Sequence, residues 1–175
     1  MTHANGVIET ITVGAYTVKA SHLVTGTTRS AATGAMGAVD DLDLTTGVAS
    51  PGGEGPWTFD TVDFGGGPWR DTNGEAPDFF VFECGGNDTI TVTAILPDGK
   101  AGKPVAIARN AWKTTGIASK VASGDAAGIA LETTSLLDPL GEPLARAATI
   151  KGVRIHGEPN GIDPLSISSV APPRK

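Results

Sequence analysis

The stretch that most constrains the fold of this chain is residues 71–96, DTNGEAPDFFVFECGGNDTITVTAIL. Residues 89–94 alternate between threonine and aliphatic side chains, a period of two that is typical of a strand with one buried and one solvated face. Residues 79–84 carry large apolar side chains on both faces, which predicts a central strand covered on both sides. Between them lies a Gly-Gly-Asn-Asp turn, whose residues tolerate positive φ. The stretch therefore predicts a β-hairpin.

The rest of the chain repeats short apolar runs between turn signals. With 24 Gly and 12 Pro among 175 residues, turns should be many and helices few. We expect an opening hairpin over 6–25 that turns at Gly14, and a strand over 103–108. A second hairpin is expected around Gly124, and two closing strands over 149–156 and 164–171. Eight to ten strands at this spacing predict an all-β protein, an antiparallel β-sandwich.

Helical signal is confined to two places. Residues 108–116 have room for a single helical turn, which carries Trp112. Residues 134–146 can hold a short helix, limited by Pro139 and Pro143.

The length fits one domain with two parts. Residues 1–56 should hold the opening hairpin and a long Gly-, Ala- and Thr-rich excursion over 26–56, packed on the domain or on a neighbouring molecule. Residues 57–175 should form the sandwich core. Loops as long as this excursion are usually functional or partner-bound.

Charge and hydropathy exclude several classes of protein. A net charge of −6 without a basic stripe argues against nucleic-acid binding, which needs cations to neutralise phosphates. No apolar run approaches the roughly 20 residues that span a bilayer, so membrane insertion is not expected. The first residues lack a signal-peptide pattern, which favours synthesis in the cytoplasm. The single Cys84 excludes an internal disulfide and should be a buried thiol.

The stretches DTNGEAPDFFVFECGGNDTITVTAILPDG (71–99) and TIKGVRIHGEPNGIDPLSISSVA (149–171) together resemble the galactose-binding-like jelly-roll group. That group includes discoidin-type domains and several carbohydrate-binding modules. The resemblance spans about the last two thirds of the chain and implies a non-catalytic jelly roll that binds sugars or other surface groups at loops on one end. Sandwiches rich in Gly, Thr and Ala without signal peptides are also similar to bacteriophage decoration, tail and spike proteins.

An acidic loop is the candidate metal site. Asp71, Asn73 and Asp78 place oxygen ligands around Gly74, as short loops do when they wrap Ca²⁺, a cation that takes six to eight oxygens. The resemblance adds Asp163 near the last strand as a fourth candidate. The spacing departs from the EF-hand pattern. The alternative is a polar turn whose side chains hydrogen-bond their own backbone.

Two tryptophans are the candidate ligand-binding residues. Trp57 and Trp69 each follow Gly-Pro, and Arg70 is adjacent to the second. Sugar sites need flat aromatic faces beside polar groups that orient hydroxyls. The alternative is that the tryptophans cap the ends of the core or are buried against a neighbouring subunit.

Catalytic signals are weak, so we expect no enzyme. His3, His22 and His156 show no spacing for a Ser-His-Asp triad or a metal site.

Two functions remain. The first is a structural subunit of a large, virion-like assembly, a decoration, cement, spike or tail protein at the particle surface. Its partners would be copies of itself, other structural proteins and cell-surface polysaccharide. The second is a secreted or displayed, calcium-assisted carbohydrate-binding or adhesion module. We favour the first.

Overall fold

The computed structural model describes residues 2–4, 7–25, 27–30, 58–64, 69–70, 77–118, 125–157 and 164–170. Their regular structure is antiparallel strands joined by single turns of 3-10 helix, so the all-β prediction is confirmed. The three turns are η1 (Ala20–His22), η3 (Arg109–Ala111) and η4 (Thr133–Ser135). The helix predicted over 134–146 is reduced to η4. In the described ranges, no helix has the length and hydropathy to cross a membrane.

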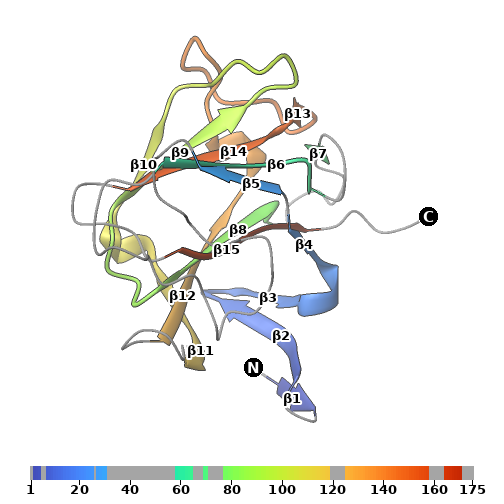
Figure 1. The fold of residues 1–175 in the computed structure, drawn as a ribbon, viewed down its shortest axis with the longest axis vertical. Coiled ribbons are helices and arrows are strands. Elements are labelled where there is room, and N and C mark those ends of the chain that lie inside the picture. The colour runs from blue at the N-terminus through green and yellow to red at the C-terminus, as the bar shows by residue number, and fades with distance from the viewer. Residues whose placement is uncertain are drawn as a thin grey trace.

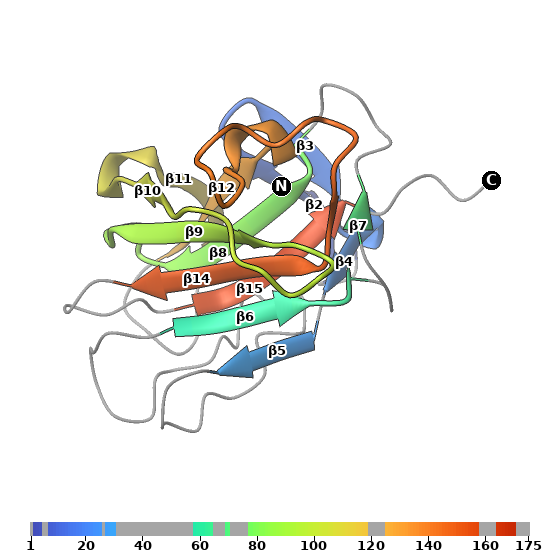
Figure 2. The same ribbon diagram turned by 90° about the horizontal axis from the view of Figure 1, so that it is seen from above.

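Two five-stranded sheets make up most of the molecule (Figure 1). The central sheet has the order β11 (Lys113–Ala118), β12 (Asp125–Leu131), β8 (Phe79–Cys84), β15 (Pro164–Val170) and β4 (Leu23–Thr25). The upper sheet has the order β10 (Val105–Ile107), β9 (Ile90–Ile95), β14 (Gly152–Gly157), β6 (Thr58–Val62) and β5 (Thr27–Ser30). Figure 2 shows β9, β14, β6 and β5 side by side as one layer.

Two smaller sheets complete the fold. The N-terminal sheet has the order β1 (Thr2–Ala4), β2 (Val7–Val13) and β3 (Tyr16–Lys19). Strands β2 and β3 are the opening hairpin predicted over 6–25, but it ends at Lys19, because β4 pairs with β15 in the central sheet. Strands β7 (Trp69–Arg70) and β13 (Thr149–Ile150) form a separate pair.

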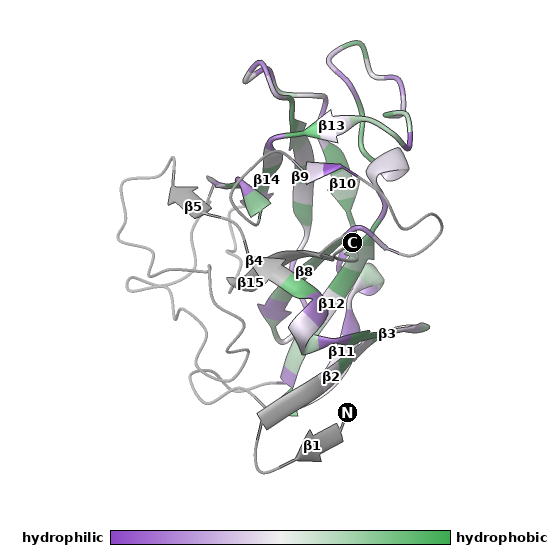
Figure 3. Ribbon diagram, turned by 90° about the vertical axis from the view of Figure 1, so that its right-hand side faces the viewer, coloured by the Kyte–Doolittle hydropathy of each residue, from purple (hydrophilic) through white to green (hydrophobic). Residues whose placement is uncertain are grey.

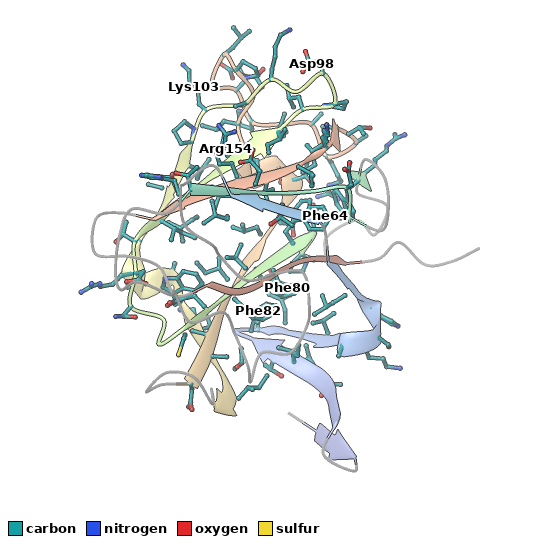
Figure 4. All side chains as sticks on the ribbon, in the orientation of Figure 1. Phe64, Phe80, Phe82, Asp98, Lys103 and Arg154 are labelled. Atoms are coloured by element: carbon teal, nitrogen blue, oxygen red, sulfur yellow. The ribbon has the colours of Figure 1, made fainter. Side chains whose placement is uncertain are left out.

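The central strand β8 contributes to a hydrophobic core on each of its faces. Phe79 and Val81 belong to the upper core, which also holds side chains of the upper sheet. Phe80 and Phe82 belong to the lower core, together with side chains of β2 in the N-terminal sheet. In Figure 4, Phe80 and Phe82 lie on the N-terminal-sheet side of β8. Figure 3 shows hydrophobic stretches along β8 and β9 and hydrophilic ones in the loops near β13. The predicted central strand, covered on both faces, is confirmed because all six of its residues are buried.

The predicted hairpin over 79–96 is wrong. β8 pairs with β12 and β15 in the central sheet, whereas β9 pairs with β10 and β14 in the upper sheet. Residues 85–89 therefore carry the chain from one sheet to the other. Gly85 and Gly86 have positive φ, and the amide of Asn87 donates to Oε1 of Glu83. This is the turn chemistry the sequence indicates, but both edges of β8 are already occupied, so β9 cannot pair with it.

The other strand predictions are confirmed except the single strand over 149–156, which is divided into β13, paired with β7, and β14 in the upper sheet. β9 and β10 form a hairpin over the turn at 97–100, and β11 and β12 form another. Residues 105–107, 152–157 and 164–170 are strands as expected. The 3-10 turn η3 precedes Trp112, in the place of the single helical turn predicted there.

The Gly-, Ala- and Thr-rich excursion is an insertion between two paired strands. Of its residues 26–56, the structure describes β5, which lies beside β6 with Ser30 opposite Phe59. The remainder, residue 26 and residues 31–56, lies outside the described residues. Its two attachment points are adjacent at one end of the upper sheet. The described strands of residues 1–56 join all three larger sheets, and the division at residue 56 stays a prediction.

The N-terminal sheet approaches the central sheet closely at Gly128, so we predict that Gly128→Ala destabilises the fold. A Cβ at Gly128 would lie 2.8 Å from Cγ2 of Val13 and 3.0 Å from Cε1 of Phe82. Gly128→Ala should lower the free energy of unfolding by about 1–3 kcal/mol, as overpacking in cores does, measured by urea denaturation.

The control for this prediction is the same substitution in a Val13→Ala background. Removing the Val13 methyl groups should relieve part of the clash, so Gly128→Ala should cost less there. An equal cost in both backgrounds would contradict the contact between the two sheets.

Candidate functional site

Trp69 lies in the upper core. It is 5% exposed, and its ring centroid lies 4.5 Å from that of Phe79. β7 holds it in place by pairing with β13, with Trp69 opposite Ile150. The ring is buried among core residues, so Trp69 caps the core, which is the alternative that the sequence left open. Arg70 beside it is exposed. Trp57, the other candidate for sugar stacking, lies outside the described residues.

Asp78, one of four candidate calcium ligands, serves the junction between β8 and β12. Its side chain is 1% exposed, and Oδ2 accepts a hydrogen bond of 2.6 Å from the amide of Thr133. Its own amide donates to the carbonyl of Leu131 at 2.8 Å. Asp78 therefore ties the start of β8 to the end of β12, a structural role.

The three other candidate ligands, Asp71, Asn73 and Asp163, lie outside the described residues. Within the described ranges, no cluster of three or more His, Cys, Asp or Glu side chains has the spacing of a metal site. The calcium site stays a prediction.

The outer face of the upper sheet carries two polar side-chain pairs between the neighbouring strands β14 and β6. Arg154 on β14 donates from Nε and Nη2 to the two carboxylate oxygens of Asp60 on β6, at 2.7 and 2.9 Å. This hydrogen-bonded pairing raises the pKa of Arg154. Beside it, Thr58 Oγ1 and His156 Nδ1 lie 2.7 Å apart. The cross-strand register places both pairs directly opposite one another, so they stabilise strand pairing.

A pocket of about 370 Å³ lies beside the edge of the N-terminal sheet. All four residues of β3 line it: Tyr16, Thr17, Val18 and Lys19. The other lining residues are His22 of η1, Pro77, which precedes β8, and Phe80 of β8. The pocket thus lies between the N-terminal and central sheets. Its volume falls in the range of about 300–1,000 Å³ for small-molecule sites.

The walls of the pocket differ in chemistry. Val18 packs against the lower core, and Pro77 and Phe80 are buried, so these residues form an apolar floor. Tyr16, Lys19 and His22 are exposed and form a rim that combines an aromatic ring with two nitrogen donors. This mixture of an apolar floor and a few polar groups is typical of ligand sites.

The sequence places residues 16–25 on the second strand of the opening hairpin, but it does not identify them as a site. The pocket depends on the position of β3 over the start of β8, and those segments are about sixty residues apart in the chain. The sequence pattern within either segment does not indicate that the two segments are in contact.

A second surface feature is a loop tip at the opposite end of the molecule. Oδ1 of Asp138 accepts hydrogen bonds of 2.8, 2.7 and 2.9 Å from the amides of Leu140, Gly141 and Glu142. These bonds hold the side chain of Leu140 at 80% exposure. Figure 4 shows Lys103 and Asp98 in the same group of loops. Asp-Pro-Leu-Gly is a turn sequence, since Asp accepts from following amides and Pro fixes φ.

Acid should loosen this loop tip. The pKa of Asp138 lies below its ordinary value of 3.8, first because of the hydrogen bond from the amide of Glu142. A lowered pKa in the folded state means that the charged carboxylate stabilises the fold above the unfolded-state pKa, and that this is lost as pH falls through the folded-state pKa. The amide resonances of residues 140–142 should move together in an NMR titration below pH 3.8.

The matched variants are Asp138→Ala and Asp98→Ala. Asp138→Ala should abolish that shared titration and speed amide exchange at residues 140–142. Asp98→Ala should leave both unchanged, since Asp98 pairs with Lys100 and accepts from its amide. Slow exchange at 140–142 in Asp138→Ala would show that other contacts hold the tip.

Comparison with known proteins yields no relative. A scan against protein-family models, a search of curated proteins and a search of solved structures each returned no match.

Proposed function

We propose that this protein is a non-catalytic structural subunit of a large, virion-like assembly, with its β-strands arranged as a jelly-roll sandwich. In such an assembly it would act as a decoration, cement, spike or tail protein at the particle surface. Its partners would be copies of itself and other structural proteins, with contact to cell-surface polysaccharide. Synthesis in the cytoplasm before assembly goes with this proposal.

Strand order supports the jelly-roll arrangement. In the central sheet, β4 neighbours β15, which neighbours β8 and then β12. In the upper sheet, β6 neighbours β14, which neighbours β9 and then β10. The strands β6, β8 and β9 fall in alternate sheets along the chain, and the last strands, β14 and β15, insert between early ones. This nesting is what two interlocked Greek keys produce. β5 and β11 extend one edge of each sheet.

Jelly rolls of eight strands occur in viral capsid proteins and in lectins. The arrangement thus agrees with both functions that the sequence leaves open. The choice between the two functions has to come from segments of the chain that lie outside the jelly-roll strands.

The insertion between β5 and β6 is the observation that carries the assembly proposal. Ser30 lies opposite Phe59, so a connection of two to five residues would close this hairpin. The chain instead places residues 31–57 there. A long insertion that the fold does not require points to contacts outside the domain, and burial of this segment against neighbouring subunits would hold the assembly together.

Shortening the insertion tests the proposal. Replacing residues 32–57 with Asn-Gly should close a two-residue hairpin and leave the fold intact, as judged by far-UV circular dichroism. Light scattering should show the full chain as a discrete oligomer or polymer, and the shortened chain as a monomer. A control chain with residues 32–57 shuffled should also fail to assemble if the segment is recognised by sequence.

Two results would contradict the assembly proposal. One is a full chain that stays at its monomer mass of 17.7 kDa at every concentration. The other is a shortened chain that assembles as the full chain does.

The second candidate function is a calcium-assisted carbohydrate-binding module, which the pocket beside β3 favours. If Asp71, Asn73, Asp78 and Asp163 bind Ca²⁺, added calcium should raise the melting temperature relative to the chelated protein, because ligands that bind the folded state stabilise it. Asp163→Asn should abolish this rise without lowering the melting temperature in chelator. Equal melting temperatures with and without calcium would show that the protein binds no calcium, and would contradict the calcium-assisted part of this function.

A further inference from the structure

We propose that the pocket beside β3 binds a carboxylate-bearing sugar residue of the uronic-acid class. This deepens the polysaccharide contact of the proposed function, and it rests on that contact but not on assembly. None of the described lining residues is one of the tryptophans or acidic side chains that the sequence singles out.

The position of Tyr16 is the first argument. The register of β2 and β3 places Tyr16 opposite Val13 and Val18 opposite Ile11. Residues directly opposite share a face, and Val13 and Ile11 are buried in the lower core. Tyr16 therefore lies on the face of β3 that is turned toward the central sheet, yet it is 44% exposed. Its ring is at the rim of the pocket, where an aromatic face can stack on the C–H groups of a sugar.

Among the described residues no strand pairs with the outer edge of β3, so this edge supplies backbone hydrogen-bonding groups. β3 is the last strand of the order β1-β2-β3, and a two-residue turn with Gly14 at positive φ joins it to β2. In such a hairpin the pair next to the turn exchanges hydrogen bonds, and bonded pairs then alternate. Val13–Tyr16 and Ile11–Val18 are therefore the bonded pairs. The N–H and C=O groups of Thr17 and Lys19 point outward, where sugar hydroxyls can bind them.

The charge of the residues that line the pocket favours an acidic sugar as its ligand. Lys19 and His22 line the pocket, and none of its described lining residues is acidic. Lys19 supplies a positive charge at this pocket, although the chain as a whole carries a net charge of −6. An ammonium group donating to a carboxylate makes a stronger hydrogen bond than a neutral pair does. By the same alternation, Lys19 lies on the face of β3 opposite to Tyr16, and its flexible four-carbon stem can carry the ammonium group over the strand edge to the mouth of the pocket. A carboxylate bound there would distinguish a uronic acid from the neutral hexose.

The shape of the site favours a sugar over an acidic peptide. A peptide strand that added to the edge of β3 would gain hydrogen bonds along its length. β3 has only four residues, and two of them direct their backbone groups outward. The pocket has an apolar floor and a volume of about 370 Å³, which suits a ring of a polysaccharide rather than an extended strand.

The test is titration of the full chain with a galacturonic acid trisaccharide, followed by NMR and calorimetry. The galactose trisaccharide is the matched neutral ligand, because it differs at the carboxylate. We expect amide shifts at residues 16–22 and binding of the acidic ligand that is roughly tenfold tighter than that of the neutral one. Tyr16→Ala should weaken binding of both ligands by roughly tenfold.

The substitution Lys19→Gln tests the contribution of the lysine charge to binding. It should weaken binding of the acidic trisaccharide by roughly tenfold and leave binding of the neutral one unchanged. Lys103→Gln, which removes a lysine in the loops at the other end of the molecule, is the control and should change neither. Lys19 is exposed, so its substitution should leave the fold intact.

Three results would overturn the proposal. One is the absence of shifts at residues 16–22 at saturating ligand. Another is equal binding of the two trisaccharides. The third is displacement of the acidic trisaccharide by hexaglutamate at lower concentration, which would assign the pocket to an acidic peptide. The hairpin-shortened chain keeps β3, so sugar binding by a shortened chain that remains monomeric separates this proposal from the assembly proposal.

Discussion

Burial of both faces of β8 is the constraint on which the rest of this structure depends. Phe79, Phe80 and Phe82 are each at most 1% exposed, and they alternate between two cores. Fully burying one such ring contributes about 1.5–3 kcal/mol relative to leaving it exposed. One covering sheet would bury only half of this strand. The chain therefore needs a layer on each side of the central sheet, and the N-terminal sheet is the second of them.

The same constraint sets the path of the chain beyond β8. A strand buried on both faces and paired on both edges has no free edge for the strand that follows it, so residues 85–89 must cross to the upper sheet. The crossing is anchored where it begins, since Glu83 accepts from the amide of Asn87. It is anchored again where it ends, because Trp112 Nε1 donates to the carbonyl of Asp88 at 2.7 Å. Hydrogen bonds from Asn87 to Glu83 and from Trp112 to Asp88 thus fix the crossing that follows the apolar strand β8.

Patterns within one segment predict the elements of this fold, but not their neighbours. Alternation in 89–94 and the double-faced run in 79–84 identify two strands, because both signals depend on residues close in the chain. Whether those strands pair is decided by β12 and β15, which come much later in the chain. The Gly-Gly-Asn-Asp turn suits a hairpin and a crossing equally well. Trp69 shows the same limit, since a Gly-Pro-Trp sequence does not say that Phe79 will cover the ring.

The layered arrangement also explains why a pocket lies beside β3. The N-terminal sheet has three strands and the central sheet that it covers has five, so the smaller sheet ends before the larger one does. Phe80 and Pro77 lie at that boundary and form a floor that β3 overhangs. The insertion at 31–57 is attached to the upper sheet, on the other side of the central sheet from β3 (Figure 1). The attachment points of the segment proposed for assembly are therefore separated from the proposed sugar pocket by a full layer, so a subunit of this design can hold its neighbours through one sheet and bind a polysaccharide beside another.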